Sequence, residues 1–239
     1  MEFTYQAYMD MLTSLKDNGY ENADYFTSEN FEKCAVLRHD IDMSIDKALQ
    51  LAKLEASAGV KSTYFVLLGT HFYNIAEREN RQKLIEIKEL GHDIGLHFDE
   101  LNYPASTDVE AAILNEASVM EQLLGVEIKT VSMHRPSKET LAANYQLKGE
   151  LVNSYGSIFF NSYKYVSDSR MRWREDVMDI IKSNAFPKLH ILTHAFWYND
   201  EELPIGEILR LFIANAGKER YSALHDNLTD LDSIIENVD

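Results

Sequence analysis

Short apolar runs alternate with longer amphipathic stretches through most of the chain. The short runs predict buried strands, and the longer stretches, with apolar residues every three or four positions, predict helices. Residues 151–160 contain both patterns, and we expect part of this segment to be strand. We expect strands at residues 34–41, 62–68, 92–98, 127–133 and 189–193, and helices at 44–58, 76–90, 107–124, 174–183 and 201–216.

Several of these predicted helices carry recognisable end signals. Ser44 is placed to cap the start of the first helix, and Gly59, Gly91 and Gly125 follow the ends of the first three. Strands that alternate with helices at this spacing predict a parallel sheet with helices outside it. Both a barrel and a doubly wound sheet satisfy that pattern. The sequence has no GxGxxG and no P-loop motif, so a nucleotide-binding sheet has no support.

Composition and charge indicate a globular protein and argue against a nucleic-acid partner. The chain has 239 residues, and 45% of them are hydrophobic, which fits a globular protein. We expect one domain over residues 1–239, with a loosely held acidic tail from about residue 226. The net charge of −16 argues against a nucleic-acid partner, because an acidic surface repels phosphate backbones.

Cysteine usage and hydropathy bear on the compartment. The single cysteine, Cys34, lies in an apolar run and is expected to be a buried, inert thiol. No apolar stretch reaches the roughly 20 residues that a membrane span needs, and the first residues have no signal-peptide pattern. We therefore expect a cytoplasmic protein with no membrane span.

Polar residues gather where the first predicted strand ends. Side chains alternate faces along a strand, so Arg38, Asp40 and Asp42 should point the same way. Two carboxylates this close resist joint ionisation, and either a metal ion or Arg38 would relieve the repulsion. Asp42 has a structural alternative as a helix N-cap, for which Ser44 competes.

Other predicted strands also end in chemically active side chains. In parallel α/β folds these ends meet at one edge, where catalytic residues sit. Carboxylate and imidazole together suit zinc or another divalent transition metal, and three protein ligands leave a fourth position open for catalysis. The residues delivered to this edge are Asp40, Asp42, His97, His134, Arg135 and His194.

At these positions the sequence resembles the NodB-type polysaccharide deacetylases, carbohydrate esterases with a distorted (β/α) barrel. Five short segments in order, between about residues 34 and 198, carry the resemblance. They are 38–42 (RHDID), 91–97 (GHDIGLH), 134–136 (HRP), 168–173 (DSRMRW) and 192–194 (LTH).

The resemblance implies a role for each matching residue. Asp40 would be the catalytic base, with Arg135 positioning it and holding it ionised. Asp42 and His97 would bind the metal. His194 would be the general acid, oriented by Asp168, and Trp173 and Trp197 would line the substrate site, although ordinary core packing explains either tryptophan equally well.

One position departs from the family pattern. The family's second metal histidine follows the first by four residues, and here that position is Leu101. We predict His134 as the replacement ligand, because it adjoins Arg135 at the same edge, with Asp99 as the second choice. The alternative for His134 is an ordinary hydrogen-bonded core histidine.

The implied reaction is hydrolysis of the N-acetyl group of an amino sugar or polysaccharide precursor. The implied cofactor is a divalent metal, Zn²⁺ before Co²⁺ or Ni²⁺. By family analogy the substrate would be a nucleotide- or lipid-linked N-acetyl sugar. Two alternatives stay open: a metal-dependent hydrolase of another amide, and a degenerate, non-catalytic glycan-binding module, which Leu101 motivates.

Overall fold

A parallel sheet forms the core of the protein, and each pairing between its described strands is parallel. The computed structural model describes residues 1–145, 147 and 151–235. The strand order is β6-β5-β4-β3-β2-β8-β7, with β1 paired to β2 off this path. The strands are β1 (Glu21–Ala23), β2 (Cys34–Ile41), β3 (Thr63–Val66), β4 (Asp93–Asp99), β5 (Thr130–His134), β6 (Val152–Asn153), β7 (Lys164–Ser167) and β8 (Lys188–Thr193).

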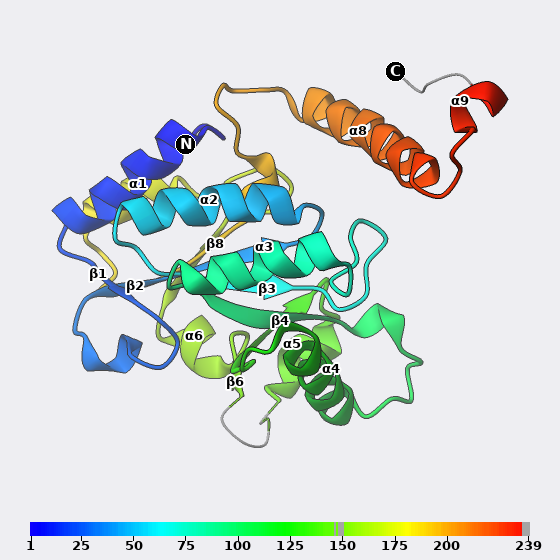
Figure 1. Cartoon of the computed structure of the whole chain (residues 1–239). Helices are drawn as coiled ribbons and strands as arrows, with labels where there is room; N and C mark the ends of the chain where they lie inside the picture. Colours follow the sequence, from blue (N-terminus) through cyan, green and yellow to red (C-terminus); the bar gives the residue numbers. More distant parts are fainter. Residues whose placement is uncertain (146, 148–150, 236–239) are drawn as a thin grey trace. The chain divides into compact units, whose positions relative to one another are not determined.

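The sheet curls into an open half-barrel with helices outside it, which confirms the predicted distorted (β/α) barrel (Figure 1). Among the described residues no pairing joins β6 to β7, so the barrel stays open at that seam. Helix α2 contacts α3, α3 contacts α4, and both α3 and α4 contact β4. The helices of this part are α1 (Tyr5–Asp17), α2 (Ile45–Ser57), α3 (Arg78–Glu89), α4 (Val109–Leu124), α5 (Lys138–Ala143), α6 (Ser157–Asn161) and α7 (Val177–Ser183), with 3-10 turns η1 (Ser28–Asn30), η2 (Glu100–Asn102) and η3 (Ala195–Trp197).

Strand β2 lies at the centre of the sheet, and all eight of its residues are buried. It pairs with β3 on one side and with β8 on the other, so that Arg38 lies between Thr63 and Leu192. A strand buried on both faces needs a continuous apolar run, and the chain supplies one up to Leu37. Polar residues begin only at Arg38, towards the carboxyl end of the strand.

The first predicted helix has the predicted ends. The Ser44 hydroxyl accepts a hydrogen bond from the Lys47 backbone N–H and caps α2, and Gly59 beyond its end adopts a φ of 70°. Helix α4 ends the same way, at Gly125 with a φ of 68°. Such left-handed positions favour glycine because other residues carry a Cβ that crowds the backbone.

Gly95 in β4 is required for a different reason, which is space. A Cβ at this position would lie 2.5 Å from the Thr130 hydroxyl and 2.6 Å from the Phe65 ring. Thr130 belongs to β5 and Phe65 to β3, the two neighbours of β4. Glycine therefore lets side chains from both neighbouring strands pack over β4.

The chain divides into two compact units, Met1–Asp200 and Glu201–Asp239. The first unit holds the whole sheet and the motif-bearing segment 34–198. The second consists of α8 (Ile205–His225), the short α9 (Leu231–Ile234) and their connections. The acidic tail predicted from residue 226 is mostly exposed as far as residue 235, and residues 236–239 lie outside the described residues. One domain over residues 1–239 stays a prediction.

The predicted strands at 34–41, 62–68, 92–98, 127–133 and 189–193 all appear, most of them shorter than predicted or shifted along the chain by a few residues. The ambiguous segment 151–160 splits into β6 and the start of α6. The prediction contains neither α1 nor β7. None of the described helices is both long and apolar enough to cross a membrane.

Candidate active site

A cleft of about 940 Å³ opens at the carboxyl ends of the strands. It brings together residues from β2, β4, β5, β8 and the loop after β7. Seven of the nine residues given a role from the sequence line it. The exceptions are Asp168, which lies behind His194, and Trp173. Arg38 and the second-choice ligand Asp99 do not line it either. The lining comprises Asp40, Asp42, Met43, His97, Met133, His134, Arg135, Pro136, Tyr155, Ser169, Arg170, Arg172, Arg174, Leu192, His194 and Trp197.

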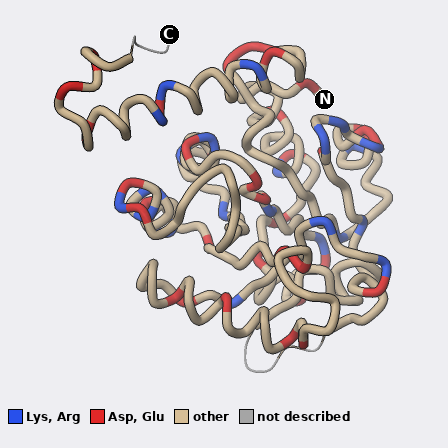
Figure 2. The backbone as a smooth tube through the Cα atoms, turned by 90° about the vertical axis from the view of Figure 1, so that its right-hand side faces the viewer, with Lys and Arg blue, Asp and Glu red and all other residues tan. Residues whose placement is uncertain are grey.

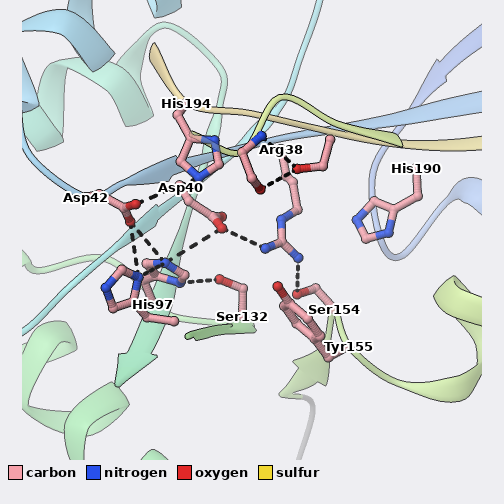
Figure 3. A network of polar contacts seen from close by, with 12 residues as sticks. Arg38, Asp40, Asp42, His97, Ser132, Ser154, Tyr155, His190 and His194 are labelled. Carbon is pink, nitrogen blue, oxygen red and sulfur yellow. Dashed lines mark hydrogen bonds and ion pairs between the residues drawn. The ribbon is translucent and has the colours of Figure 1, made fainter. Parts of the chain in front are cut away.

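Asp40 is held by Arg38, its neighbour on the same face of β2 (Figure 3). The Arg38 guanidinium, which is fully buried, donates to Asp40 Oδ2 at 2.7 Å and to the Ser154 hydroxyl at 3.0 Å. It also lies 4.9 Å from the centre of the Tyr155 ring. The other carboxylate oxygen, Asp40 Oδ1, is buried and has no hydrogen-bond partner among the described residues. One oxygen of Asp40 is therefore anchored and the other is free to take a proton.

Asp42, His97 and His134 form a cluster that could hold a metal ion. One ligand atom from each residue lies within 4.8 Å of the other two. Asp42 Oδ1 lies 3.3 Å from His97 Nε2 and 3.3 Å from His134 Nδ1, and the two nitrogens are 3.1 Å apart. In a tetrahedral site with ligand bonds of about 2.0–2.1 Å, ligand atoms lie roughly 3.3 Å from one another. The three separations in the cluster match that spacing.

The surroundings of the cluster also fit a cation. The imidazole nitrogens of His134 and His97 are 3.1 Å apart, so they can share one proton in a hydrogen bond. If both are unprotonated, as metal binding requires, their lone pairs repel each other unless a positive charge lies beside them. His97 Nδ1 lies 2.6 Å from the Ser132 hydroxyl. A proton on Nδ1, donated to Ser132, leaves Nε2 unprotonated and directed at Asp42, as metal-binding histidines require.

His194 faces the same cluster from β8. Its Nε2 lies 3.7 Å from Asp42 Oδ2, and its Nδ1 lies 2.6 Å from Asp168 Oδ1. The other Asp168 oxygen accepts from the His194 backbone N–H at 3.1 Å and from the Tyr198 hydroxyl at 3.2 Å. Asp168 is fully buried, so these bonds fix the orientation of the His194 ring.

The electrostatics separate the protonation states of these groups. Burial lowers the pKa of His194, but the Asp168 carboxylate outweighs burial and raises that pKa to about 9. Burial raises the pKa of Asp40, and Arg38 more than reverses this and holds the pKa below its ordinary value. Burial likewise raises the pKa of Asp42, and the adjacent imidazoles of His134 and His97 hold it well below its usual range. A protonated imidazole therefore faces ionised carboxylates at neutral pH.

Arg135 does not make the contact expected of it. Its guanidinium pairs with Asp99, and its side chain is 59% exposed, while Arg38 occupies the position beside Asp40. The same pair removes Asp99, the second-choice ligand, from the metal cluster, where His134 is found. Leu101 is 66% exposed in η2, so the residue at the family's usual ligand position faces solvent.

The two tryptophans differ in position. Trp197 lines the cleft but is buried, with 6% of the residue exposed. It can therefore form part of the cleft wall but has little surface on which a sugar could stack. Trp173 is half-buried and is not among the residues that line the cleft. Its role in substrate binding stays a prediction.

Sequence reasoning missed two supporting groups, Ser132 and Ser154. It considered Tyr198 only as an aromatic wall for a sugar and missed its hydrogen bond to Asp168. Ser132 lies on β5 two residues before His134, on the same face, so strand alternation could have identified it. Ser154 follows β6 and Tyr198 follows η3. Strand alternation does not extend to these positions, so it could not have placed their side chains at the site. Arg38 was recognised as a possible counter-charge for Asp40 and Asp42, but not as the direct partner of Asp40.

Neither a known family model nor a curated protein sequence matches this chain. Among solved structures, it is similar to the peptidoglycan deacetylase PdaC of Bacillus subtilis, with 13% identity, a TM-score of 0.46 and coverage of 80% of this chain and 97% of the other. A family 4 carbohydrate esterase from Bacillus anthracis has 19% identity, a TM-score of 0.43 and coverage of 79% and 77%. A CE4 family pseudoenzyme from Bacillus anthracis has 14% identity, a TM-score of 0.45 and coverage of 77% and 60%.

Proposed function

We propose that this protein is a metal-dependent hydrolase that removes the N-acetyl group from an amino sugar. One observation carries the proposal: two further groups lie within 4 Å of the cluster Asp42–His97–His134. They are the Asp40 carboxylate, which has a free oxygen, and the His194 imidazole, which a buried carboxylate orients. Hydrolysis of an amide needs a base for water, an acid for the leaving amine and stabilisation of the oxyanion. The N-acetyl sugar as substrate rests on the resemblance of the five motifs.

Each of the chain's groups has a defined task in this proposal. Asp40 accepts the proton of the attacking water at Oδ1, while Arg38 holds Oδ2. His194 donates a proton from Nε2 to the leaving nitrogen, and Asp168 keeps its ring in place through Nδ1. Asp42, His97 and His134 would hold a Zn²⁺ ion, whose chemistry there would be polarisation of the acyl carbonyl and a lowered pKa of water.

The non-catalytic, glycan-binding alternative rested on Leu101. His134 supplies an imidazole to the cluster, so the loss of the usual histidine does not leave the ligand set short. A binding module also has no use for a base and an oriented acid beside a set of metal ligands. The hydrolase is therefore the better supported of the two functions.

The test begins with the chain treated with a chelator and then reloaded with Zn²⁺, Co²⁺ or Ni²⁺. Metal content is measured by mass spectrometry, and released acetate is measured with chitin oligosaccharides and other N-acetylated sugars. We expect one metal per chain and acetate release that depends on it. Asp40→Asn should retain the metal and lower the rate by at least about a hundredfold, the typical contribution of a general base.

His97→Ala is expected to lose both metal and activity. His71→Ala is its matched control, because His71 is exposed and lies outside the cleft. Full activity in Asp40→Asn would refute the role given to Asp40. A chain that binds glycans but holds no metal would favour the non-catalytic alternative.

A further inference from the structure

Arginine side chains are concentrated at the candidate active-site cleft. Nine arginines occur in the sequence, and four of them line the cleft: Arg135, Arg170, Arg172 and Arg174. All four are exposed, whereas Asp40 and His97 beside them are buried. This concentration is notable in a chain with a net charge of −16.

Among the described residues, three of these four arginines have no acidic partner. Arg135 pairs with Asp99, but Arg170, Arg172 and Arg174 form no ion pair within the part of the chain that the structure describes. The acids nearest to them in sequence are already engaged. Asp168 holds His194 and Tyr198, Glu175 pairs with Lys164, and Asp176 caps α7.

The backbone that carries these arginines is unusual. Of the five described non-glycine residues with positive φ, Asn144 and Asn184 end helices, where asparagine tolerates that conformation. The other three are Arg135, Arg170 and Met171, with φ values of 49°, 60° and 55°. Strained conformations of this kind tend to occur at ligand-binding sites. Two of the three residues line the cleft.

The Arg135 guanidinium is available to a ligand, because Asp40 does not need it as a counter-charge. Arg38 already fills the position beside Asp40, which leaves the Arg135 guanidinium directed at Asp99 and exposed at the cleft. The cleft thus contains the aspartates and histidines proposed for hydrolysis, and a separate group of guanidinium donors beside them.

We propose that the cleft binds an N-acetylated sugar that carries a phosphate or diphosphate group, held by Arg135, Arg170, Arg172 and Arg174. This inference rests on the proposed function and specifies its substrate class. Guanidinium groups bind phosphate through paired, charge-assisted hydrogen bonds. The volume of about 940 Å³ can hold a sugar together with such a group.

The charge balance favours phosphate over carboxylate. A sugar carboxylate brings one negative charge, while three guanidinium groups here have no acid partner among the described residues. A phosphate monoester or a diphosphate brings about two charges and more acceptor oxygens. An acidic chain repels every anion at a distance, so a local group of arginines is what an anionic substrate would require.

The test measures binding to the full-length, metal-free chain by calorimetry, because phosphate would also bind a metal directly. The probes are N-acetylglucosamine, its 1-phosphate, UDP-N-acetylglucosamine and N-acetylmuramic acid, which carries a carboxylate. We expect both phosphate probes to bind at least about tenfold more tightly than the neutral sugar. Raising NaCl from about 50 to 500 mM should weaken only the binding of the charged probes.

The double variant Arg170→Gln/Arg172→Gln and the single variant Arg174→Gln should lose most of the preference for phosphate. Arg78→Gln, at an exposed position at the start of α3, should retain it. Circular dichroism melts confirm that each variant is folded, and Arg174→Gln avoids the strained position at 170. A difference between the two phosphate probes shows whether a nucleotide adds to recognition of the phosphate.

Equal affinity for neutral and phosphorylated sugars would overturn the inference, as would variants with unchanged preference. Tighter binding of N-acetylmuramic acid than of the phosphate probes would replace phosphate by carboxylate and also overturn it. None of these outcomes bears on acetate release. The proposed hydrolysis therefore stands or falls separately, on metal-dependent activity and on Asp40→Asn.

Discussion

Arg38 and Arg135 differ in burial and in what each neutralises. Arg38 is fully buried against Asp40, which is itself only 5% exposed. Arg135 is mostly exposed beside Asp99. A buried ion pair that loses one partner leaves an uncompensated charge in the interior, whereas an exposed pair is screened by water.

We therefore expect Arg38→Met to lower the free energy of unfolding by about 3–5 kcal/mol, because it leaves the buried Asp40 carboxylate without a counter-charge. Arg135→Met should change it by less than about 1 kcal/mol. Urea denaturation of both variants and of the unchanged chain measures the difference. Equal losses in the two variants would contradict the assignment of Arg38 as the partner of Asp40.

Ser132 acts on the metal cluster through His97. Ser132→Ala removes the hydroxyl that lies 2.6 Å from His97 Nδ1 and frees the ring to turn. We expect metal affinity to fall about 10- to 100-fold, the usual effect of losing such a partner. Competition with a chromophoric chelator measures this affinity, with Ser118→Ala, at an exposed position on α4, as the control. Unchanged affinity would show that Ser132 does not orient His97.

The sequence allows the residues of the site to be predicted better than their contacts. Strand alternation places Arg38, Asp40 and Asp42 on one face, but it does not say which of the two carboxylates Arg38 pairs with. Arg135 lies one residue after the end of β5, where a φ of 49° ends the alternation. No spacing rule indicates where a side chain points after such a backbone turn, so its partner Asp99 could not be foreseen.

At the scale of elements, a buried carboxylate joins two helices to two strands behind the site. Glu55 on α2 is fully buried and accepts hydrogen bonds from Tyr8 of α1 at 2.6 Å and Tyr64 of β3 at 2.7 Å. Ser62, which precedes β3, donates at 2.5 Å, and His39 of β2 lies at 2.9 Å. Because β2 also carries Asp40, this network fixes the strand that carries the proposed base.

Glu55 should make the fold sensitive to acid. Burial raises its pKa, but His39 and the hydrogen bonds outweigh burial and lower that pKa from 4.5 to about 2. A depressed pKa stabilises the folded state above the unfolded value of 4.5, and this stability is lost as the pH falls towards 2. The contribution is on the order of 3 kcal/mol.

Urea denaturation between pH 6 and 2 tests this prediction. We expect Glu55→Gln to be less stable than the unchanged chain at pH 6, because an amide cannot accept all the bonds that the carboxylate accepts. The variant should also lose part of the acid-induced decline. An equally steep decline in the variant would show that other carboxylates are responsible.

Elements with a strong pattern were predictable, and short or terminal ones were not. Strand β2 and helix α4 combine a long apolar pattern with clear end signals. Strand β7 has four residues, two of them half-buried, and its place beside β8 comes from pairing that no local pattern encodes. Short strands take their structure from their neighbours, so sequence periodicity alone cannot identify them.

At the scale of the whole molecule, acidic residues occur on helices and loops throughout, rather than on a single element (Figure 2). The residues of the candidate active site, in contrast, are confined to one of the two units. The sheet, the cleft and every residue assigned to the site lie within the unit Met1–Asp200. Helices α8 and α9 belong to the other unit and supply none of these residues.

We expect a chain truncated after residue 200 to fold and to bind metal with unchanged stoichiometry. The physical reason is that the truncation removes no strand of the sheet and no lining residue of the cleft. Circular dichroism and metal analysis check this, with the full chain as the reference. Loss of cooperative melting would show that the second unit completes the fold of the first.

Gly95 is not one of the residues of the candidate active site, but a substitution there would disturb that site. An added methyl group would press on the Phe65 ring, which lies 5.2 Å from the Arg38 guanidinium, the group that restrains Asp40. The effect of a substitution that adds no charge and touches no proposed ligand would thus pass through one aromatic ring to Asp40, the proposed proton acceptor. Variants that lose the proposed activity need not map to the cleft, and we expect Gly95→Ala in the middle of β4 to be one.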